Sequence, residues 1–272
     1  MTLTDVRADE RRAFVEATIR FTDPSSAGAV LHSQDHDSST FALIPRTVRI
    51  HNARAEADRL SFEQNGFTLI RHAFDEIDWF DRDEVQARYY PQAARIVQAL
   101  TGAREVLVFL DMIRSEVREE GAEPANNAHV DFDEPSLHGW IRMLRPHDAE
   151  ALVKKRIVNI NLWRPLRPVE RMPLAVCDAS SVGSHDLVRT LIGVKPGQPA
   201  GPYAGFNLAY NPAQRWYWYP DMQPGELLAF KLFDSDRTRP HLTAHTAFAD
   251  PASREGAPTR LSIEVRTIAI MD

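Results

Sequence analysis

The sequence predicts a mainly β fold with flanking helices, organised as an antiparallel barrel or jelly roll. Strand-like segments dominate the chain after residue 104, and turns rich in Pro, Gly and Asp separate them. Strands do not alternate with helices as they do in βαβ proteins, and no glycine-rich phosphate loop is present. The strand-like segments are EVLVFLDMI, RIVNINLWRP, PLAVCD, AGFNLAYNP, RWYWYP, GELLAFKLFD, LTAHTAFAD and RLSIEVRTIAI.

The N-terminal part is expected to contribute further strands. Apolar and polar residues alternate over 13–21, which favours a half-buried strand, although a helix through 4–20 is an alternative. Short strands are expected around 47–51 and 67–71. Residues 22–40 are loop-like and long enough to form a mobile lid.

Helical periodicity is strongest over 82–101, where apolar residues recur at nearly every fourth position and Gly102 provides a stop. A second helical segment is expected at 146–156, within the strand-rich part of the chain. The segment YNPAQRW lies between two aromatic strands and is predicted to be a hairpin connection.

Length and composition fit one large folded domain. The chain has 272 residues, of which 43% are hydrophobic and 26% are charged, so it can bury a sizeable core. We therefore predict a single domain over 1–272, in which the strands and helices of 1–104 pack on a β core formed by 105–272.

Charge and cysteine content exclude several kinds of partner and site. The net charge is −6 and no lysine- or arginine-rich run is present, which argues against nucleic acid or an anionic membrane as a partner. The single cysteine, Cys177, excludes an internal disulfide and a thiolate metal cluster. No apolar run of about 18 residues is present, so nothing is expected to span a membrane. A cytoplasmic protein is expected, and a homodimer is left open.

The segment NNAHVDFDEP, residues 126–135, contains a candidate metal-binding pair. His129 lies two positions before Asp131, with Asp133 as an alternative acid. Because 10 histidines and 38 acidic residues are present, chance alone predicts a His-x-acid sequence, and a hydrogen-bonded histidine in a turn is the simpler interpretation. The pair gains weight from His245, 114 residues after Asp131, because two histidines and one carboxylate can hold iron while leaving positions open for other ligands.

Arg260 and Ser262 follow His245 at the start of the last strand-like segment and are candidate ligands for a carboxylate. An arginine fork binds carboxylates well, and a nearby hydroxyl can bond the same group. The element alone is weak evidence, because Arg59-Leu60-Ser61 also matches it but precedes every candidate ligand. Arg260 and Ser262 share the polar face of this strand, and this face is expected either to face solvent or to point into the barrel.

Other residues are candidates for a substrate pocket. Asn161 and Trp163 share one face of a predicted strand, which either lines the cavity or faces water. Residues that either contact substrate or only stabilise the fold are Arg142, Tyr210 and Lys231.

The order of these elements resembles the iron(II)/2-oxoglutarate-dependent oxygenases, and within them a hydroxylase/desaturase group that includes AsaB-like fungal enzymes and a protein associated with cephalosporin 7α-methoxylation. The likeness covers about residues 65–268. The segments that carry it are EVQARYYPQAARIVQALTGA, HVDFD, NLWRPL, PLAVCDASSV, YNPAQRWYWYPDM, LLAFKLFDS, AHTAFADP and RLSIEVR.

This resemblance implies a double-stranded β-helix core and an enzyme that uses iron(II), 2-oxoglutarate and O2. It implies that His129, Asp131 and His245 hold the iron, with His245 preferred over His241 because the ligand precedes the sequence TAF. Arg260 and Ser262 would bind 2-oxoglutarate. The expected reaction is hydroxylation, desaturation or cyclisation of a small organic molecule in natural-product biosynthesis.

Two other functions remain open at this point. The same three ligands would serve a non-haem iron oxidase that needs no 2-oxoglutarate, with Arg260 binding a carboxylate of the substrate. A non-catalytic jelly roll that binds a metal or another ligand would also fit the pattern.

Overall fold

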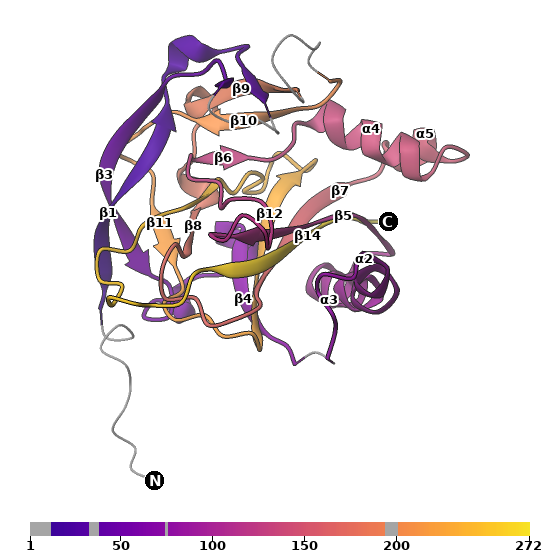
Figure 1. Cartoon of the computed structure of the whole chain (residues 1–272). Helices are drawn as coiled ribbons and strands as arrows, with labels where there is room; N and C mark the ends of the chain where they lie inside the picture. Colours follow the sequence, from indigo (N-terminus) through magenta and orange to yellow (C-terminus); the bar gives the residue numbers. More distant parts are fainter. Residues whose placement is uncertain (1–11, 33–37, 74–75, 194–200) are drawn as a thin grey trace.

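Two β-sheets enclose the main hydrophobic core of the computed structural model, which describes residues 12–32, 38–73, 76–193 and 201–272 (Figure 1). The larger sheet has nine strands in the order β1-β3-β11-β8-β13-β6-β10-β9-β2, and the smaller has five in the order β4-β12-β7-β14-β5. The strands of the larger sheet are β1 (Phe14–Thr22), β3 (Leu43–Asn52), β11 (Trp216–Trp218), β8 (Leu174–Cys177), β13 (His245–Ala247), β6 (His129–Val130), β10 (Ala204–Leu208), β9 (Leu187–Gly193) and β2 (Val30–His32). Those of the smaller sheet are β4 (Phe67–Arg71), β12 (Glu226–Asp234), β7 (Ile157–Pro165), β14 (Leu261–Ile270) and β5 (Glu105–Ser115).

The path of the chain between the two sheets is that of a jelly roll. From β5 to β8 successive strands alternate between the smaller and the larger sheet, and from β11 to β14 they alternate again. Strands β9 and β10 are inserted between these two halves and extend the larger sheet beside β6. The mainly β class and the jelly-roll core predicted from the sequence are confirmed.

The smaller sheet is buried on both faces, which explains why its strands are rich in apolar residues. All nine residues of β7 are buried. On one face Val158, Ile160 and Leu162 pack in a cluster with the helical segment around Tyr89. On the other face Trp163 joins the core between the sheets. The predicted division of this strand into two faces is therefore correct.

The predicted helix at 82–101 is present as three consecutive helical stretches. These are α2 (Arg82–Glu84), a π-helical turn (Val85–Tyr89) and α3 (Tyr90–Thr101). Gly102 ends the last stretch with a positive φ of 69°, a conformation that glycine adopts without strain. Helix α3 covers the outer face of the smaller sheet at β5 and β14 (Figure 1). None of the described helices is long and apolar enough to cross a membrane.

The N-terminal segments join both sheets. Residues 14–22 form β1, so the strand predicted at 13–21 is confirmed, and β1 pairs antiparallel with β3 along its whole length. Strand β4 pairs with β12 in the other sheet. In the segment predicted as a lid, 22–40, Val30–His32 form β2, which pairs with β9, and residues 33–37 lie outside the described residues.

Three sequence-based predictions of local structure need correction. The segment YNPAQRW is not a hairpin connection, because β10 pairs with β6 and β9 whereas β11 pairs with β3 and β8. Within 146–156 only Ala149–Leu152 form a helix, α5. In the strand-like segment LTAHTAFAD only His245–Ala247 pair as a strand.

Helix α4 (Glu134–Leu144) was missed, although its start has a recognisable signal. Asp133 is its N-cap and accepts a hydrogen bond from the Ser136 backbone N–H at 3.0 Å, and Pro135 lies in the first turn. The remaining helix is α1 (Phe62–Asn65), and short 3-10 turns lie at 24–26, 57–59, 179–181 and 184–186.

Replacing Gly205 with alanine is expected to destabilise the protein. A Cβ at this position of β10 would lie 2.6 Å from the Val130 carbonyl oxygen and 2.5 Å from that of Asp131, so β6 would have to move. The free energy of unfolding should fall by about 1–3 kcal/mol, as measured by urea denaturation. Gly225→Ala is the matched control, because a Cβ there meets no atom within 4 Å. Equal stability of both variants would contradict the close approach of β10 to β6.

Candidate metal centre

Three side chains with metal-binding atoms meet in the larger sheet. His129 lies on β6 and His245 on the adjacent strand β13, where the two residues are directly paired. Asp131 follows β6 by one residue, so its side chain points to the same side of the strand as His129. One potential ligand atom from each of the three residues lies within 4.8 Å of the others.

The geometry of this cluster fits a divalent metal ion. Asp131 Oδ1 lies 3.3 Å from His129 Nε2 and 3.6 Å from His245 Nε2, so two imidazole nitrogens and one carboxylate oxygen converge. The two imidazole rings are 4.3 Å apart and tilted by 48°. Two histidines and one carboxylate that leave other positions open are the typical ligand set of non-haem iron(II) oxygenases.

Hydrogen bonding and burial prepare the three groups to bind a cation. The Asn127 backbone oxygen accepts a hydrogen bond from His129 Nδ1 at 2.8 Å, which leaves the Nε2 lone pair free. Burial, reinforced by the neighbouring His129, lowers the pKa of His245 to about 3, so its imidazole is neutral. Burial alone would raise the pKa of Asp131, but Arg266 and the two histidines hold it well below its ordinary value. Asp131 is therefore a carboxylate at neutral pH.

The alternative ligands weighed from the sequence have other contacts. Asp133 caps helix α4, and its Oδ2 accepts a hydrogen bond from Arg189 Nε at 2.9 Å. His241 lies outside the cluster of potential ligand atoms, and its Nδ1 is 3.3 Å from the Arg239 backbone oxygen.

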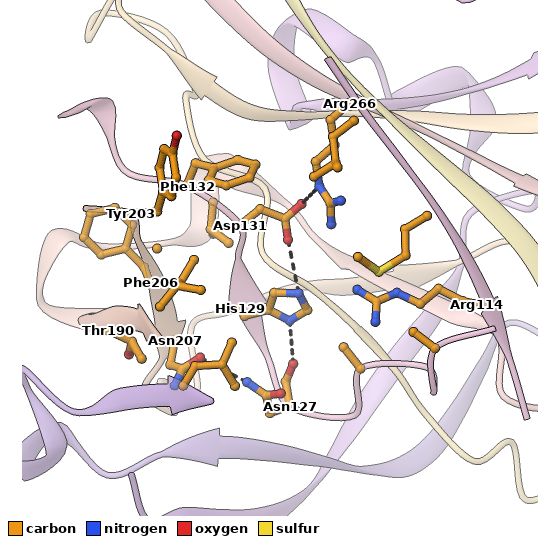
Figure 2. A pocket seen from close by; sticks show the side chains of 18 of the residues that line it. Arg114, Asn127, His129, Asp131, Phe132, Thr190, Tyr203, Phe206, Asn207 and Arg266 are labelled. Carbon is orange, nitrogen blue, oxygen red and sulfur yellow. Dashed lines mark hydrogen bonds and ion pairs between the residues drawn. The ribbon is translucent and has the colours of Figure 1, made fainter. Parts of the chain in front are cut away.

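A cavity of about 760 Å³ lies beside His129 and Asp131 (Figure 2). Aromatic side chains form much of its wall: Phe132, Phe206, and the rings of Trp140 and Tyr203, which stack 5.3 Å apart. Leu110 and Met112 extend this apolar wall from β5, and the cationic lining residues are Arg114, Arg118 and Arg266. The cavity therefore suits a mainly apolar small molecule with direct access to the metal ligands.

Arg260 and Ser262 lie together in the interior of the barrel but not on the wall of this cavity. Arg260 is 2% exposed, and its Nε donates a hydrogen bond to Ser262 Oγ at 3.1 Å. Its Nη1 donates to the Met172 carbonyl oxygen, and its guanidinium lies 5.0 Å from the centre of the Trp163 ring. Within the described ranges no carboxylate forms an ion pair with Arg260, and burial lowers its pKa to about 9.

Of the residues suggested for a substrate pocket, three are buried and two are exposed. Asn161 and Trp163 are buried in the barrel, and the Asn161 amide and the Trp163 Nε1 have no hydrogen-bond partner among the described residues. Arg142 lies on α4 and pairs with Glu150, whereas Tyr210 is 43% exposed and packs on Phe21. Lys231 is buried and paired with Asp234. None of the five lines the cavity beside the metal ligands.

Several residues of the site were not selected from the sequence. Arg266 bonds Asp131 directly, and Glu264 in turn bonds Arg266. The backbone oxygen of Asn127 orients His129. Arg266 and Glu264 could have been found from the sequence, because they share one strand face with Ser262. Trp140 and Tyr203 carried no such signal, because their proximity depends on how α4 packs beside β10.

Comparison with known proteins decides the family. A family model described as an oxidoreductase/YMDC permease-like domain matches residues 19–270. The hydroxylase/desaturase efuI of Hormonema carpetanum is 30% identical over 250 residues, which cover 83% of this chain and 83% of that protein. The Fe(II)/2-oxoglutarate-dependent dioxygenase nvfI of Aspergillus novofumigatus is 31% identical over 241 residues, 85% of each chain. The chain belongs to the iron(II)/2-oxoglutarate-dependent oxygenases.

A solved structure has the same fold as this oxygenase. The iron and alpha-ketoglutarate-dependent endoperoxidase NvfI superposes with a TM-score of 0.87 at 27% identity, covering 96% of this chain and 99% of that one. The family resemblance inferred from the sequence is confirmed. The oxygenase is an oxidoreductase whose cofactors are iron(II), 2-oxoglutarate and O2, and its family is consistent with a small-molecule substrate.

Substitution of Asp131 should abolish metal binding, whereas substitution of Asp133 should lower stability and leave metal binding intact. Asp131→Ala is expected to abolish iron(II) binding by the oxygenase, because it removes the carboxylate between the two histidines. Asp133→Ala should leave iron binding intact but lower the free energy of unfolding by about 1–2 kcal/mol, because a helix cap is lost. Equilibrium dialysis with iron(II) under argon and urea denaturation measure the two effects. Retained iron binding in Asp131→Ala would remove this residue from the ligand set.

Proposed function

We propose that this oxygenase hydroxylates, desaturates or cyclises a mainly apolar small molecule in natural-product biosynthesis. In this proposal His129, Asp131 and His245 hold iron(II), and Arg260 with Ser262 binds the distal carboxylate of 2-oxoglutarate. The observation that carries it is the convergence of two imidazole nitrogens and one carboxylate oxygen beside a cavity with aromatic walls.

The residues of the triad fit iron(II) both in type and in protonation. His245 has a depressed pKa and therefore offers its nitrogen lone pair at neutral pH, and Asp131 supplies one negative charge. When bound, iron(II) with 2-oxoglutarate supplies the oxygen-dependent oxidising chemistry of the site. The protein's own contribution would be to fix three ligand atoms at the paired strands β6 and β13.

The unpaired charge of Arg260 supports its role in binding 2-oxoglutarate. Arg114 and Arg266 each have a carboxylate partner, Glu264 and Asp131 respectively. Arg260 is 2% exposed, as deeply buried as Arg266, but its side chain bonds only a hydroxyl and a backbone carbonyl among the described residues. Glu264 and Glu116 attract this buried cation without forming an ion pair with it, and a bound carboxylate would offset the remaining cost of its burial.

Buried polar atoms without partners lie next to this arginine. Trp163, whose ring lies against the Arg260 guanidinium, has an unpartnered Nε1, and Asn161 has an unpartnered side-chain amide. Both residues lie on β7 and are paired with residues of the neighbouring strand β14: Asn161 with Arg266, and Trp163 with Glu264. Such atoms are rarely left unpaired in a native interior, so they support a polar ligand in this part of the barrel.

The cavity wall supports a mainly apolar substrate. The rings of Trp140, Tyr203 and Phe132 offer flat apolar surface next to the metal ligands, and they would keep water away from the reacting atoms. Polar and charged side chains also line the cavity, among them Arg118, Asn127 and Thr190, and these would orient the substrate.

We also propose that residues 1–272 act as one oxygenase domain in the cytoplasm, without a nucleic-acid or membrane partner. The net charge of −6 supports the absence of a nucleic-acid partner, because the phosphate backbone attracts basic proteins. Strands from the N-terminal part in both sheets support a single domain.

Alanine at His129 or at His245 should abolish both iron(II) binding and succinate formation from 2-oxoglutarate. Each variant removes one of only two imidazole ligands, whereas His241→Ala removes a nearby histidine that is outside the cluster. Succinate formation with purified iron-loaded protein, measured against oxygen consumption, checks the result. The ligand assignment is wrong for any histidine whose alanine variant keeps full turnover.

Arg260→Met is expected to weaken 2-oxoglutarate binding about 10- to 100-fold, because a charge-assisted hydrogen-bonded pair is lost. Anaerobic titration of the iron(II)-loaded protein with 2-oxoglutarate, followed by the absorption band of the metal chelate, measures this affinity. Iron(II) binding itself should not change.

Two other arginines provide controls for this titration. Arg254→Met removes an exposed arginine from the same connecting segment and should leave the affinity unchanged. Arg114→Met removes an arginine that lines the cavity. If Arg114→Met weakens 2-oxoglutarate binding and Arg260→Met does not, the carboxylate is bound at the cavity wall and the assignment of Arg260 is wrong.

A further inference from the structure

Asp131 has two carboxylate oxygens, and only one of them faces the histidines. Oδ1 is the oxygen near His129 Nε2 and His245 Nε2. Oδ2 accepts a hydrogen bond from Arg266 Nε at 2.6 Å (Figure 2). Arg266 comes from β14 in the opposite sheet, so this contact joins the central, metal-binding strands of the larger sheet to the smaller sheet.

Arg266 is itself held by a second ion pair. Its Nη2 donates a hydrogen bond to Glu264 Oε1 at 3.0 Å. The same oxygen of Glu264 accepts a hydrogen bond from Arg114 Nε at 3.0 Å, and Arg114 Nη2 forms an ion pair with it at 3.0 Å. Arg114 lies on the adjacent strand β5 and lines the cavity, as Arg266 does. Charges of alternating sign therefore run from the cavity wall to the metal ligand, in the order Arg114, Glu264, Arg266, Asp131.

Burial makes the alternation of charges necessary. Arg266 and Glu264 are each 5% exposed and Asp131 is 8% exposed, so each charge has lost most of its hydration. An unpaired arginine this close to the metal ligands would also repel the metal cation. Because the four formal charges cancel, the arginine can contact Asp131 without adding net positive charge to the metal site.

The pKa shifts agree with this pairing. Burial alone would raise the pKa of Glu264, but Arg114 and Arg266 lower it to about 2. Burial would lower the pKa of Arg266, but Asp131 and Glu264 raise it above its ordinary value. Asp131, Glu264 and Arg266 are therefore charged at neutral pH.

We propose that Arg266 is a positioning residue for Asp131, which binds Oδ2 so that Oδ1 alone is presented to the metal, and that Glu264 and Arg114 hold Arg266 in place. This inference rests on the proposed function, because it takes Asp131 as a metal ligand. A carboxylate that is free to rotate can bind a metal through both oxygens and occupy two positions. The contact with Arg266 prevents this and keeps a position open for cosubstrate.

Metal binding by Arg266 variants tests this role without the need for a substrate. The probe is Co(II) alone, added to the full-length metal-free protein, because its visible spectrum reports coordination number. Arg266→Met should weaken Co(II) binding about 10- to 100-fold and change the spectrum, because Asp131 loses the partner of Oδ2. Arg266→Lys restores one donor and should bring back most of the affinity. Glu264→Gln should shift both quantities in the same direction by a smaller amount.

Arg164→Met is the matched control for the loss of a buried arginine. Arg164 is fully buried on the neighbouring strand β7, but its side chain bonds Tyr89 and the backbone oxygens of His72 and Pro224, away from the triad. This variant should lose stability in urea while keeping the Co(II) affinity and spectrum of the unsubstituted protein. Equal changes in Arg164→Met and Arg266→Met would show that Arg266 is only structural.

Two further outcomes separate this inference from the proposed function. If the unsubstituted protein binds Co(II) and Arg266→Met and Glu264→Gln both bind it with unchanged affinity and spectrum, the positioning role is wrong and the metal site stands. If the unsubstituted protein binds no Co(II), or binds it equally well after His129→Ala, the proposed metal site is wrong and the positioning role falls with it.

Discussion

The pairing of β6 with β13 is the contact on which the metal site depends. It places His129 directly opposite His245, although the two residues are far apart in the sequence. Strand β6 contains only two residues, so it relies on its neighbours for its position, and β10 pairs with its other edge. Gly205 allows this approach, because any Cβ at that position would overlap the β6 backbone. A three-residue site is therefore held by strands from three distant parts of the chain.

The interior of the sandwich contains an unusual number of charges, and their pairing divides them into two groups. Asp131, Arg266, Glu264 and Arg114 form one paired series, and their four formal charges cancel. The side chain of Arg260 has only neutral hydrogen-bond partners among the described residues, whereas its backbone N–H donates to Glu116. Since burial is costly for each of these groups, the paired charges fit a permanent structural role and the remaining cation fits the binding of an anion. One strand thus serves both the metal ligand and the cosubstrate in our proposal.

Much of the fold could be predicted because strand patterns are local. The two faces of β7, the strand at 14–22 and the helical region before Gly102 all follow from periodicity within single segments. The pairing partners could not be predicted in this way, and the supposed hairpin at YNPAQRW was wrong because β10 and β11 pair with strands far along the chain. Helix α4 was missed although five of its eleven residues are apolar and its start is marked by the cap at Asp133.

The same distinction between local and long-range information applies to the site. His129, Asp131 and His245 could be proposed because their types and order resemble a known ligand set, and the structure brings them together. The order of residues does not reveal which oxygen of Asp131 faces the histidines. This depends on Arg266, whose side chain reaches Asp131 only because β14 lies across the barrel from β6. For the same reason Arg142, Tyr210 and Lys231 could not be assigned to the cavity or excluded from it before the packing was known.

Much of the cavity wall comes from elements other than those that hold the metal ligands. Strands β6 and β13 carry the two histidines, whereas Trp140 comes from α4, and Tyr203 and Phe206 come from the inserted segment that contains β9 and β10. The insertion lies outside the two alternating halves of the jelly roll, so its side chains can change without altering the strand order that forms the triad. Gly205 is the exception, because it belongs to the insertion and also contacts the backbone of β6. Side chains of the insertion can therefore change the preference for substrate. The backbone of the insertion at Gly205 has to remain close to the metal site.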